Sequence, residues 1–552
     1  MNTFDAIVVG SGISGGWAAK ELCEKGLKTL MLERGSQVEH VKDYKTANMN
    51  PWDFPHGLSL SLKEKERYPV QTRHYSIKAD NKHFHVVDVE NPYTEKQRYD
   101  WIRADVVGGR SLLWGRITFR WSDLDFEANA KDGYGVDWPI RYKDLAPWYD
   151  YVERFVGITG KAEGIPHLPD SLFQAPMAMN CVEEHIKGKL EKTYPGRKLI
   201  HPRAAHLTQK LPGRDACQYR NLCHRGCPFG AYFSTQSSTL PAAMSTGNLT
   251  VKTGMIVNRV IYDEKLQSAT GVEVLDRETN KTYEYFAKII FLNASTVATT
   301  QVLLNSTSRS FPNGLGNNHD IVGRYLMDHH KTGGISADFE GFEDKYYFGR
   351  RPSGVYLPRF RNIGDDKADF LRGWGAQGSA SRSRATASGI GAEFKEAASE
   401  PGGWRFGLSG YGECLPYKEN RITLNTDLKD KWGRPTLTLD CGFKENEKKM
   451  HADIVSNLKE ILETVGGKNI RHNEQMSFPG NANHEMGTAR MGHDPKTSVL
   501  NKWNQMHDVK NLFITDGSCM TSSSCVNPSL TFMALTARAV DYAVGQTRRG
   551  NI

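Results

Sequence analysis

The sequence predicts an α/β fold, α+β overall, in which a Rossmann-like domain is joined to a second domain built on a largely antiparallel sheet. The first observation is a glycine-rich turn at residues 10–15 between two short apolar runs, 4–10 and 28–33. A strand, a helix and a second strand within about 30 residues form a βαβ unit. The second observation is that residues 333–480 alternate short β-like runs with Gly, Pro, Asp and Asn, which favours antiparallel strands.

The other elements follow from local periodicity and from the residues that end helices and strands. Residues 17–25 have helical spacing, and Gly26 ends that helix. Residues 36–100 are polar and irregular and are expected to wrap the surface, and residues 164–235 also look irregular. Strands are further expected at 249–262, 269–276, 282–293 and 511–515, and helices at 296–305, 444–465 and 529–545.

Composition excludes several classes of protein. The 552-residue chain has a net charge of +8, but its basic residues are scattered, so nucleic-acid binding has little support. The mild positive charge suits docking of an acidic protein partner at most. No apolar stretch approaches 18 residues, so no membrane span is expected. The N-terminus lacks a basic region and a cleavage site, so nothing in the chain itself directs its export.

The glycine-rich turn has the spacing G-x-G-x-x-G, formed by Gly10, Gly12 and Gly15. It follows a strand, opens a helix, and is followed by an acid, Glu33, at the end of the next strand. In that setting the motif indicates a dinucleotide site, with the pyrophosphate at the helix N-terminus and the acid at the ribose. The motif does not by itself separate NAD from FAD.

Three cysteines, Cys217, Cys223 and Cys227, have the spacing C-x5-C-x3-C, and Pro228 follows the last. Thiolates so placed suit one inorganic centre, and three without an obvious fourth favour a three-iron cluster. Zinc is disfavoured because its sites prefer closer pairs and four ligands. A loop with incidental thiols and a four-iron cluster with a non-cysteine ligand remain open alternatives. The other six are interpreted as small buried apolar residues rather than a disulfide framework: Cys23, Cys181, Cys414, Cys441, Cys519 and Cys525.

Four further segments give the chain a resemblance to a known family, the glucose–methanol–choline (GMC) oxidoreductases, over nearly its whole length. The resemblance implies FAD as the cofactor. The matching segments are Val107–Gly115, Gly323–His329, His484–Gly492, and the C-terminal pair Asp516–Ser518 with Asn527–Thr531.

The resemblance also implies which residues contact FAD besides the glycine turn and its acid. One glycine segment is expected to run past the flavin ring, and the C-terminal pair contributes further contacts. Some family members attach FAD covalently through a histidine; Leu113 stands at that position here, so non-covalent FAD is expected. The residues so implied are Gly108, Gly109, Trp114, Gly115, Asp516, Gly517, Asn527 and Pro528.

The catalytic pair is implied in the same way. Oxidation of an alcohol needs an acceptor for the hydride, which is flavin N5, and a base that titrates near neutrality, for which histidine is the usual choice. By resemblance His484 is the base, and Asn527 is the second member of the pair, which orients the substrate oxygen. His329 and His330 are the next candidates, and His329 is interpreted as structural or flavin-adjacent.

Within the family, the cysteine spacing resembles a subgroup of bacterial sugar dehydrogenases that carry a [3Fe-4S] cluster. The segment from Val107 to Phe126 most resembles the catalytic subunits of glucoside 3-dehydrogenases, which implies oxidation of the C3 hydroxyl of glucose or glucosides to 3-keto sugars. The alternatives are a glucose 1-dehydrogenase, a gluconate or fructose dehydrogenase, and less favoured a sugar oxidase that uses oxygen. A non-catalytic electron-relay subunit is disfavoured by His484 and Asn527.

The subgroup also implies partners and a location. Its large subunits pair with a small subunit that carries a twin-arginine signal, and pass electrons to a cytochrome c or similar acceptor. The chain is then expected to be periplasmic, exported folded with its partner, or cytoplasmic if it has none. The expected division is a discontinuous FAD-binding domain (1–175, 236–332 and 481–552), an iron–sulfur segment (176–235) and a substrate-binding domain (333–480).

Overall fold

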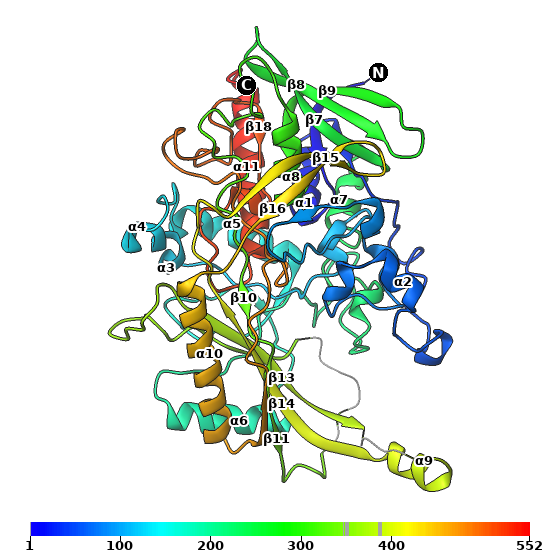
Figure 1. Cartoon of the computed structure of the whole chain (residues 1–552), viewed down its shortest axis with the longest axis vertical. Helices are drawn as coiled ribbons and strands as arrows, with labels where there is room; N and C mark the ends of the chain where they lie inside the picture. The colour runs from blue at the N-terminus through cyan, green and yellow to red at the C-terminus, as the bar shows by residue number, and fades with distance from the viewer. Residues whose placement is uncertain (1, 346, 348–352, 385–388) are drawn as a thin grey trace.

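A computed structural model describes residues 2–345, 347, 353–384 and 389–552. It is built around two sheets, one in the upper half of Figure 1 and one in the lower half, with long loops between them. Among the described helices, none combines the length and the apolar character needed to cross a membrane.

The first sheet contains the predicted βαβ unit. Its central strands pair in parallel, β2 with β1 and β1 with β9, and they are buried because helices cover them. α1, α5, α7 and α11 pack against one another beside this sheet, and α8 packs on β7. In spatial order the strands are β6 (Leu249–Lys252), β2 (Thr29–Leu32), β1 (Thr3–Val9), β9 (Thr282–Leu292), β8 (Ser268–Asp276) and β7 (Met255–Asp263), with β18 (Leu512–Phe513) also on β9. The helices are α1 (Ile13–Glu24), α5 (Tyr142–Val156), α7 (Thr239–Ser245), α8 (Thr296–Asn305) and α11 (Ser529–Arg548).

The expected strand at 249–262 is two strands. Gly254 has φ +70°, a left-handed conformation that breaks the extended chain between β6 and β7. β6 then pairs in parallel with β2, while β7 pairs antiparallel with β8. One apolar run therefore supplies both edges of the sheet.

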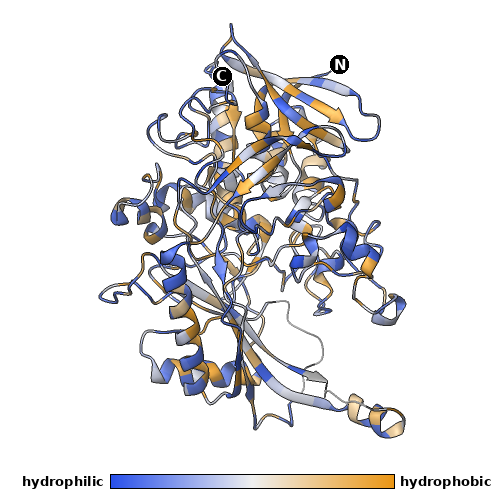
Figure 2. Cartoon of the chain, in the orientation of Figure 1, coloured by the Kyte–Doolittle hydropathy of each residue, from blue (hydrophilic) through white to orange (hydrophobic). Residues whose placement is uncertain are grey.

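The second sheet is antiparallel, so the predicted α/β fold with an antiparallel second sheet is confirmed. Side chains alternate along β14, where Trp404, Phe406 and Leu408 face the core. The amphipathic helix α10 covers this face, with hydrophobic residues turned inward and hydrophilic residues outward (Figure 2). The strands are β12 (Val355–Leu357), β13 (Trp374–Arg384), β14 (Pro401–Gly412), β11 (Ile335–Phe339) and β17 (Lys468–His472) in that order, with β10 (His330–Lys331) on β14; α10 is Glu445–Thr464.

The segment 164–235, expected from sequence to be irregular, contains a helix. α6 (Cys181–Thr193) begins at a capping box in which the Asn180 side chain accepts from the Glu183 backbone N–H. Val182, Ile186 and Leu190 recur every four residues and pack on the second sheet and α10. The helical signal was present, but the many charged residues between these positions obscured it.

The remaining strands form two smaller sheets, β15-β16-β3 and β4-β5, and the remaining helices and turns are short. They are β3 (Thr94–Glu95), β4 (Ile158–Thr159), β5 (Phe173–Gln174), β15 (Arg421–Lys429), β16 (Pro435–Asp440), α2 (Leu62–Arg67), α3 (Asp123–Phe126), α4 (Ala128–Asp132), α9 (Ala392–Ser399) and the 3₁₀ turns η1 (Pro51–Asp53), η2 (Gln71–Arg73), η3 (Lys82–Phe84), η4 (Asp88–Glu90), η5 (Gly109–Leu112), η6 (Cys223–Arg225) and η7 (Gly517–Cys519).

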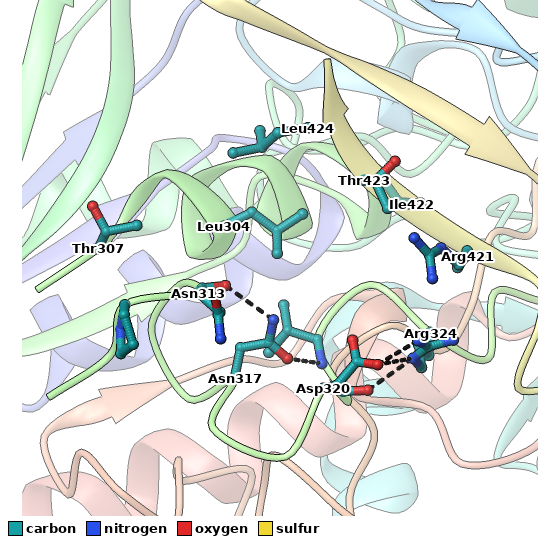
Figure 3. A pocket seen from close by; sticks show the side chains of 12 residues that line it. Leu304, Thr307, Asn313, Asn317, Asp320, Arg324, Arg421, Ile422, Thr423 and Leu424 are labelled. Atoms are coloured by element: carbon teal, nitrogen blue, oxygen red, sulfur yellow. Dashed lines mark hydrogen bonds and ion pairs between the residues drawn. The ribbon is translucent and has the colours of Figure 1, made fainter. Parts of the chain in front are cut away.

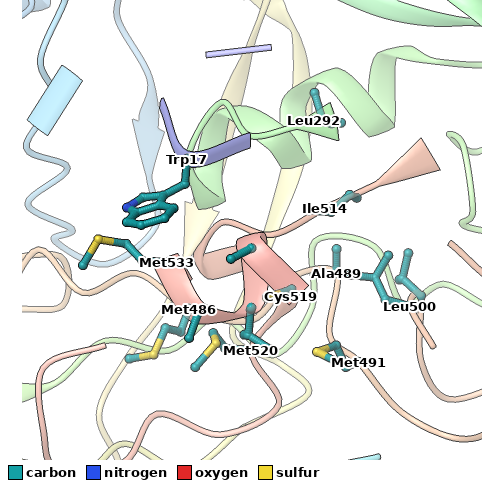
Figure 4. Close-up of a cluster of buried hydrophobic side chains, with 14 of the residues drawn as sticks. Trp17, Leu292, Met486, Ala489, Met491, Leu500, Ile514, Cys519, Met520 and Met533 are labelled. Carbon is teal, nitrogen blue, oxygen red and sulfur yellow. The ribbon is translucent and has the colours of Figure 1, made fainter. Parts of the chain in front are cut away.

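The largest hydrophobic core holds the C-terminal loops in place. Figure 4 shows Trp17 of α1, Leu292 of β9 and Met533 of α11 in one cluster with the side chains of Met486 and Met491. All five are at most 1% exposed. Each buried side chain of this kind contributes about 1.5–3 kcal/mol, and unbranched methionines fill the irregular gaps between elements. The segment that begins at residue 484 is therefore anchored directly after its histidine.

Candidate active site

A cavity of about 980 Å³ lies between the first sheet and the second. Residues from both glycine segments, from the C-terminal pair and from β13 and β14 line it. Of the residues named from sequence, those that line it are Gly10, Gly12, Glu33, Gly109, Trp114, Gly115, Cys223, His484, Asp516, Gly517, Asn527 and Pro528. Six others are not among its lining residues: Gly15, Gly108, Cys217, Cys227, His329 and His330.

The first glycine turn has the shape that a pyrophosphate requires. Gly12 is the N-cap of α1, and a Cβ added there would meet no atom within 4 Å, so the space beside it is open. A Cβ on Gly15 would lie 1.9 Å from the carbonyl oxygen of Gly10, so only glycine lets α1 pack this close to β1. The unpaired N–H groups of the helix N-terminus face the cavity and favour an anion there.

Glu33 is fixed at the end of β2 by two backbone N–H groups. Ser11 donates to one carboxylate oxygen at 3.1 Å and Gly35 to the other at 2.7 Å. Burial raises the pKa of this carboxyl, and these hydrogen bonds oppose the rise. The acid faces the cavity near the glycine turn, where a ribose hydroxyl can donate to it.

The second glycine segment is tied to the first. The Gly108 N–H donates to Ser11 Oγ at 2.8 Å, and both Gly108 and Gly109 have left-handed φ angles of +87° and +50°. These angles favour glycine and turn the chain along the cavity wall. Trp114 donates its indole N–H to the Phe233 carbonyl at 2.9 Å, which fixes the ring at the cavity edge.

The C-terminal pair also lines the cavity, and the Ser14 hydroxyl of α1 donates to the carbonyl of Thr515, directly before Asp516. Asp516 accepts hydrogen bonds from the Ser518 N–H at 3.0 Å and from the Thr299 hydroxyl at 2.6 Å, which ties the turn to α8. Pro528 is the N-cap of α11, so the positive end of a 20-residue helix lies at the cavity. Negative charge on a bound ligand is stabilised there.

His484 and Asn527 lie together at the cavity. The Asn527 amide nitrogen is 3.2 Å from His484 Nε2. Gln377, on β13, donates from its amide nitrogen to Asn527 Oδ1 at 2.7 Å. The second sheet therefore contacts the pair directly.

Two residues lie behind His484: His329, which was a runner-up for the base and was interpreted from sequence as structural or flavin-adjacent, and Asp328, which was given no role. His329 Nδ1 lies 2.9 Å from His484 Nδ1, and Asp328 Oδ1 accepts the backbone N–H of His484 at 3.0 Å. Burial lowers the pKa of His329 to about 4, and it raises the pKa of Asp328 to about 7 with help from the nearby Glu485 carboxylate. Both residues belong to the segment Gly323–His329. The resemblance of this segment to the family was the sequence signal that pointed to them. Nothing local distinguished Gln377.

The three cysteines of the spacing motif are half-buried thiols near one another. Burial raises the pKa of Cys217 to about 11, and charge on Cys223 or Cys227 adds to the rise. Cys223 Sγ lies 3.9 Å from His206 Nε2 at the cavity edge. In the part of the chain that the structure describes, no three His, Cys, Asp or Glu side chains are gathered closely enough to hold a metal ion. The iron–sulfur cluster therefore stays a prediction.

A second hollow, of about 270 Å³, lies beside β15 (Figure 3). Its walls are shaped by local contacts, in which Asn317 donates to the Asn313 carbonyl at 3.0 Å and Arg324 pairs with Asp320. None of the residues named from sequence as functional lines it. The larger cavity is the candidate active site.

The match to family models shows to which protein family the chain belongs. Two models, both described as GMC oxidoreductase, match residues 4–331 and 416–536. The chain belongs to the GMC oxidoreductase family. The predicted family is thereby confirmed.

This GMC oxidoreductase has relatives over its whole length. It is 28% identical to 2-methyl-1,2-propanediol dehydrogenase of Mycolicibacterium austroafricanum, over 98% of this chain and 94% of the relative. It is 27% identical to the fructose dehydrogenase large subunit of Gluconobacter japonicus, over 99% and 98%. Among solved structures, pyridoxine 4-oxidase from Mesorbium loti matches with a TM-score of 0.62 at 16% identity, covering 98% of this chain and 99% of that one. The last match shows the shared fold.

FAD is the cofactor of the GMC family, and the cavity fits it. Gly12 leaves open space at the N-terminus of α1 for the pyrophosphate, and the Glu33 carboxylate lines the cavity where it can accept a hydrogen bond from a ribose hydroxyl. Leu113 also lines the cavity, so the side chain at the position of possible covalent attachment is a hydrocarbon. These features fit FAD held without a covalent bond.

The pH dependence of flavin reduction in this GMC oxidoreductase tests the expectation that His484 is the base. Burial first, then the neighbouring His329 and Arg110, lower the pKa of His484 well below its usual value of 6.5. A base works while it is unprotonated, so a lowered pKa moves the loss of activity to lower pH. We expect anaerobic flavin reduction by sugar, followed by stopped flow as the rate at low sugar concentration, to persist well below pH 6.5. The buried Asp328 carboxyl, with its pKa raised to about 7, also titrates in this range. The control is therefore Asp328→Asn, in which this position no longer titrates. An acid limb at or above pH 6.5 that persists in this variant contradicts the assignment.

Proposed function

We propose that this GMC oxidoreductase is an FAD-dependent sugar dehydrogenase that oxidises the C3 hydroxyl of glucose or of glucosides to give 3-keto sugars. The observation that carries the proposal is the pair His484 and Asn527, whose Nε2 and amide nitrogen lie 3.2 Å apart at the cavity. The same cavity has the features of a dinucleotide site. Action on a CH–OH group belongs to the family; the sugar and the position of attack are the proposal.

In the proposed mechanism His484 Nε2 takes the proton of the substrate hydroxyl, and the O–H bond breaks as the N–H bond forms. Asn527 donates from its amide to the substrate oxygen and holds it beside the imidazole. FAD, when bound at Gly12 and Glu33, would supply the acceptor for the hydride that leaves the carbon bearing the hydroxyl. Asn527 is itself held by Gln377, so the second sheet sets the angle of the amide.

The part of the cavity wall that the second sheet supplies is polar. Gln377, Ser379 and Tyr411, from β13 and β14, line the cavity together with Ser353 and His74. Amide, hydroxyl and imidazole groups are suited to hydrogen bonds with several sugar hydroxyls. Relatives whose names refer to sugars or sugar derivatives, among them fructose dehydrogenase and gluconate 2-dehydrogenase, support a carbohydrate as the substrate class.

The C3 assignment rests on the resemblance of the segment from Val107 to Phe126 to glucoside 3-dehydrogenases. Its test is the product formed from methyl α-glucoside, identified by carbon NMR after turnover with an artificial acceptor. We expect a carbonyl at C3. A carbonyl at another ring position contradicts the C3 assignment and identifies the hydroxyl that is oxidised instead. The alternatives to be judged by the same product analysis are a glucose 1-dehydrogenase and a gluconate or fructose dehydrogenase. Vigorous peroxide formation instead supports a sugar oxidase.

We also propose that Cys217, Cys223 and Cys227 hold a [3Fe-4S] cluster, which supplies a one-electron exit from the enzyme to an external acceptor. Support comes from the thiol chemistry, from the electrostatic interaction of the three thiols with one another, and from the position of Cys223 at the cavity. As placed, the thiols do not form a ligand set, so cluster assembly has to draw them together.

The proposal extends to partners and location. The fructose dehydrogenase relative is named as a large subunit, which supports pairing of this chain with a small subunit. We propose that the small subunit carries a twin-arginine signal, that a cytochrome c or similar protein accepts the electrons, and that the folded complex is exported to the periplasm. Co-purification of a tagged chain from the periplasmic fraction tests the pairing and the location together.

A further inference from the structure

Each ring nitrogen of His484 has one side-chain partner. Nε2 faces the Asn527 amide nitrogen at 3.2 Å, and Nδ1 faces His329 Nδ1 at 2.9 Å. The two imidazole rings meet edge to face, at 77°. A neutral imidazole carries one N–H and one lone pair, so a partner that fixes the role of one nitrogen also fixes the role of the other.

The role of His329 follows from the backbone behind it. Its Nε2 lies 3.1 Å from the Ser523 carbonyl oxygen, which only accepts hydrogen bonds, so Nε2 carries a proton. Burial lowers the pKa of His329 to about 4, so the ring is neutral near pH 7 and Nδ1 has the lone pair. The 2.9 Å contact between the two Nδ1 atoms then needs its hydrogen from His484. His484 Nε2 is left without a proton.

The contacts on the other side of His484 agree with this assignment. Gln377 donates to Asn527 Oδ1 at 2.7 Å, so the Asn527 oxygen is engaged and its amide N–H₂ faces the histidine. An amide nitrogen is a donor, and the atom that accepts from it must have a lone pair. That atom is His484 Nε2, 3.2 Å away.

We propose that His329 is a positioning residue which, held by the Ser523 carbonyl, keeps His484 in the tautomer with its proton on Nδ1 and its lone pair on Nε2. The proposal rests on the proposed role of His484 as the base. When Nε2 takes the hydroxyl proton, Nδ1–H continues to donate to His329, so the imidazolium keeps its partner. The opposite tautomer presents an N–H to the substrate and accepts no proton.

The backbone around the pair is held by other groups. Asp328 accepts the N–H of Ala482 at 3.1 Å and the N–H of His484 at 3.0 Å. Arg110 pairs with the buried Glu485 at the next position along the chain. These contacts do not involve the His329 ring, so a change of that ring alone leaves the placement of the His484 segment intact.

The test compares His329→Leu, which removes the acceptor, with His329→Asn, whose Oδ1 stands near the position of imidazole Nδ1 and restores it. We expect the leucine variant to slow anaerobic flavin reduction about 10- to 10²-fold, by analogy with residues that orient a catalytic histidine. Apparent sugar affinity is expected to change little, and the asparagine variant to recover most of the rate. The matched control is His330→Asn, because His330 contacts Met450 rather than His484.

The second readout is independent of turnover. Nitrogen NMR of histidine-labelled holoenzyme, free of substrate, reports which ring nitrogen is protonated, and His484→Asn identifies the His484 signals. We expect Nδ1–H in the wild type and a shift toward Nε2–H in His329→Leu. Nε2–H in the wild type overturns the proposal, as do an unchanged tautomer and an unchanged rate in the leucine variant. If no sugar reduces the wild-type flavin, the proposed function fails while the tautomer measurement still decides the role of His329. If the leucine variant does not fold, the wild-type tautomer and the asparagine variant decide it.

Discussion

Replacing His484 with alanine is expected to slow turnover about 10²–10⁴-fold while FAD stays bound, which is the range for loss of a general base. The methyl group of alanine accepts no proton. His329, the neighbouring ring, is a weak replacement because it is held by the Ser523 carbonyl and burial lowers its pKa to about 4. Turnover is measured with sugar and an artificial acceptor, and FAD content by absorbance after gel filtration.

The matched control is His493→Ala, in the same C-terminal segment but exposed at the surface. We expect this variant to keep wild-type turnover. Equal activity in His484→Ala and the wild type excludes His484 as the base. Loss of FAD from His484→Ala alone points instead to a structural role for this residue in the cavity.

Replacing Cys223 with serine is expected to block electron exit far more than flavin reduction. Serine is a poor ligand for iron where thiolate is preferred, and loss of one of three thiolates is expected to lower turnover with cytochrome c at least roughly tenfold. Reduction of the flavin by sugar under anaerobic conditions is expected to stay near the wild-type rate, because His484 and Asn527 are untouched. Iron and sulfide content, together with the EPR signal of the oxidised enzyme, report the cluster directly.

Cys181→Ser provides the control for the cysteine experiment. Cys181 is half-buried like the three motif cysteines, but it lies at the start of α6 on the second sheet. A parallel loss of flavin reduction and of electron exit in Cys223→Ser assigns the loop a folding role. A wild-type enzyme without iron or sulfide, purified without exposure to oxygen, removes the cluster from the proposed function.

Local signals in the sequence were sufficient for much of the fold. The helix expected at 296–305 coincides with α8, and the one at 444–465 differs from α10 by one residue at each end. Both have strong periodicity and clear ends, which is where reasoning from sequence works best. The glycine turn was also accessible, since its function depends on a strand, a turn and a helix that are neighbours in the chain.

The contacts that complete the candidate site were not accessible in this way. His329 lies 155 residues from His484, and Gln377 lies 150 residues from Asn527. Contacts between residues so far apart in the sequence produce no periodic or compositional signal, because both contacts form only when the two sheets are placed around the cavity. Gly254 is a similar case at smaller scale: an apolar run that reads as one strand is divided by a single left-handed residue.

The most direct measurement is anaerobic bleaching of the flavin absorbance by glucose and, separately, by methyl α-glucoside. Methylation blocks the anomeric hydroxyl, so oxidation at C1 is impossible in the second sugar. We expect both sugars to bleach the flavin, since the proposed enzyme acts at C3. Bleaching by glucose alone contradicts this and identifies a C1 dehydrogenase that forms a lactone.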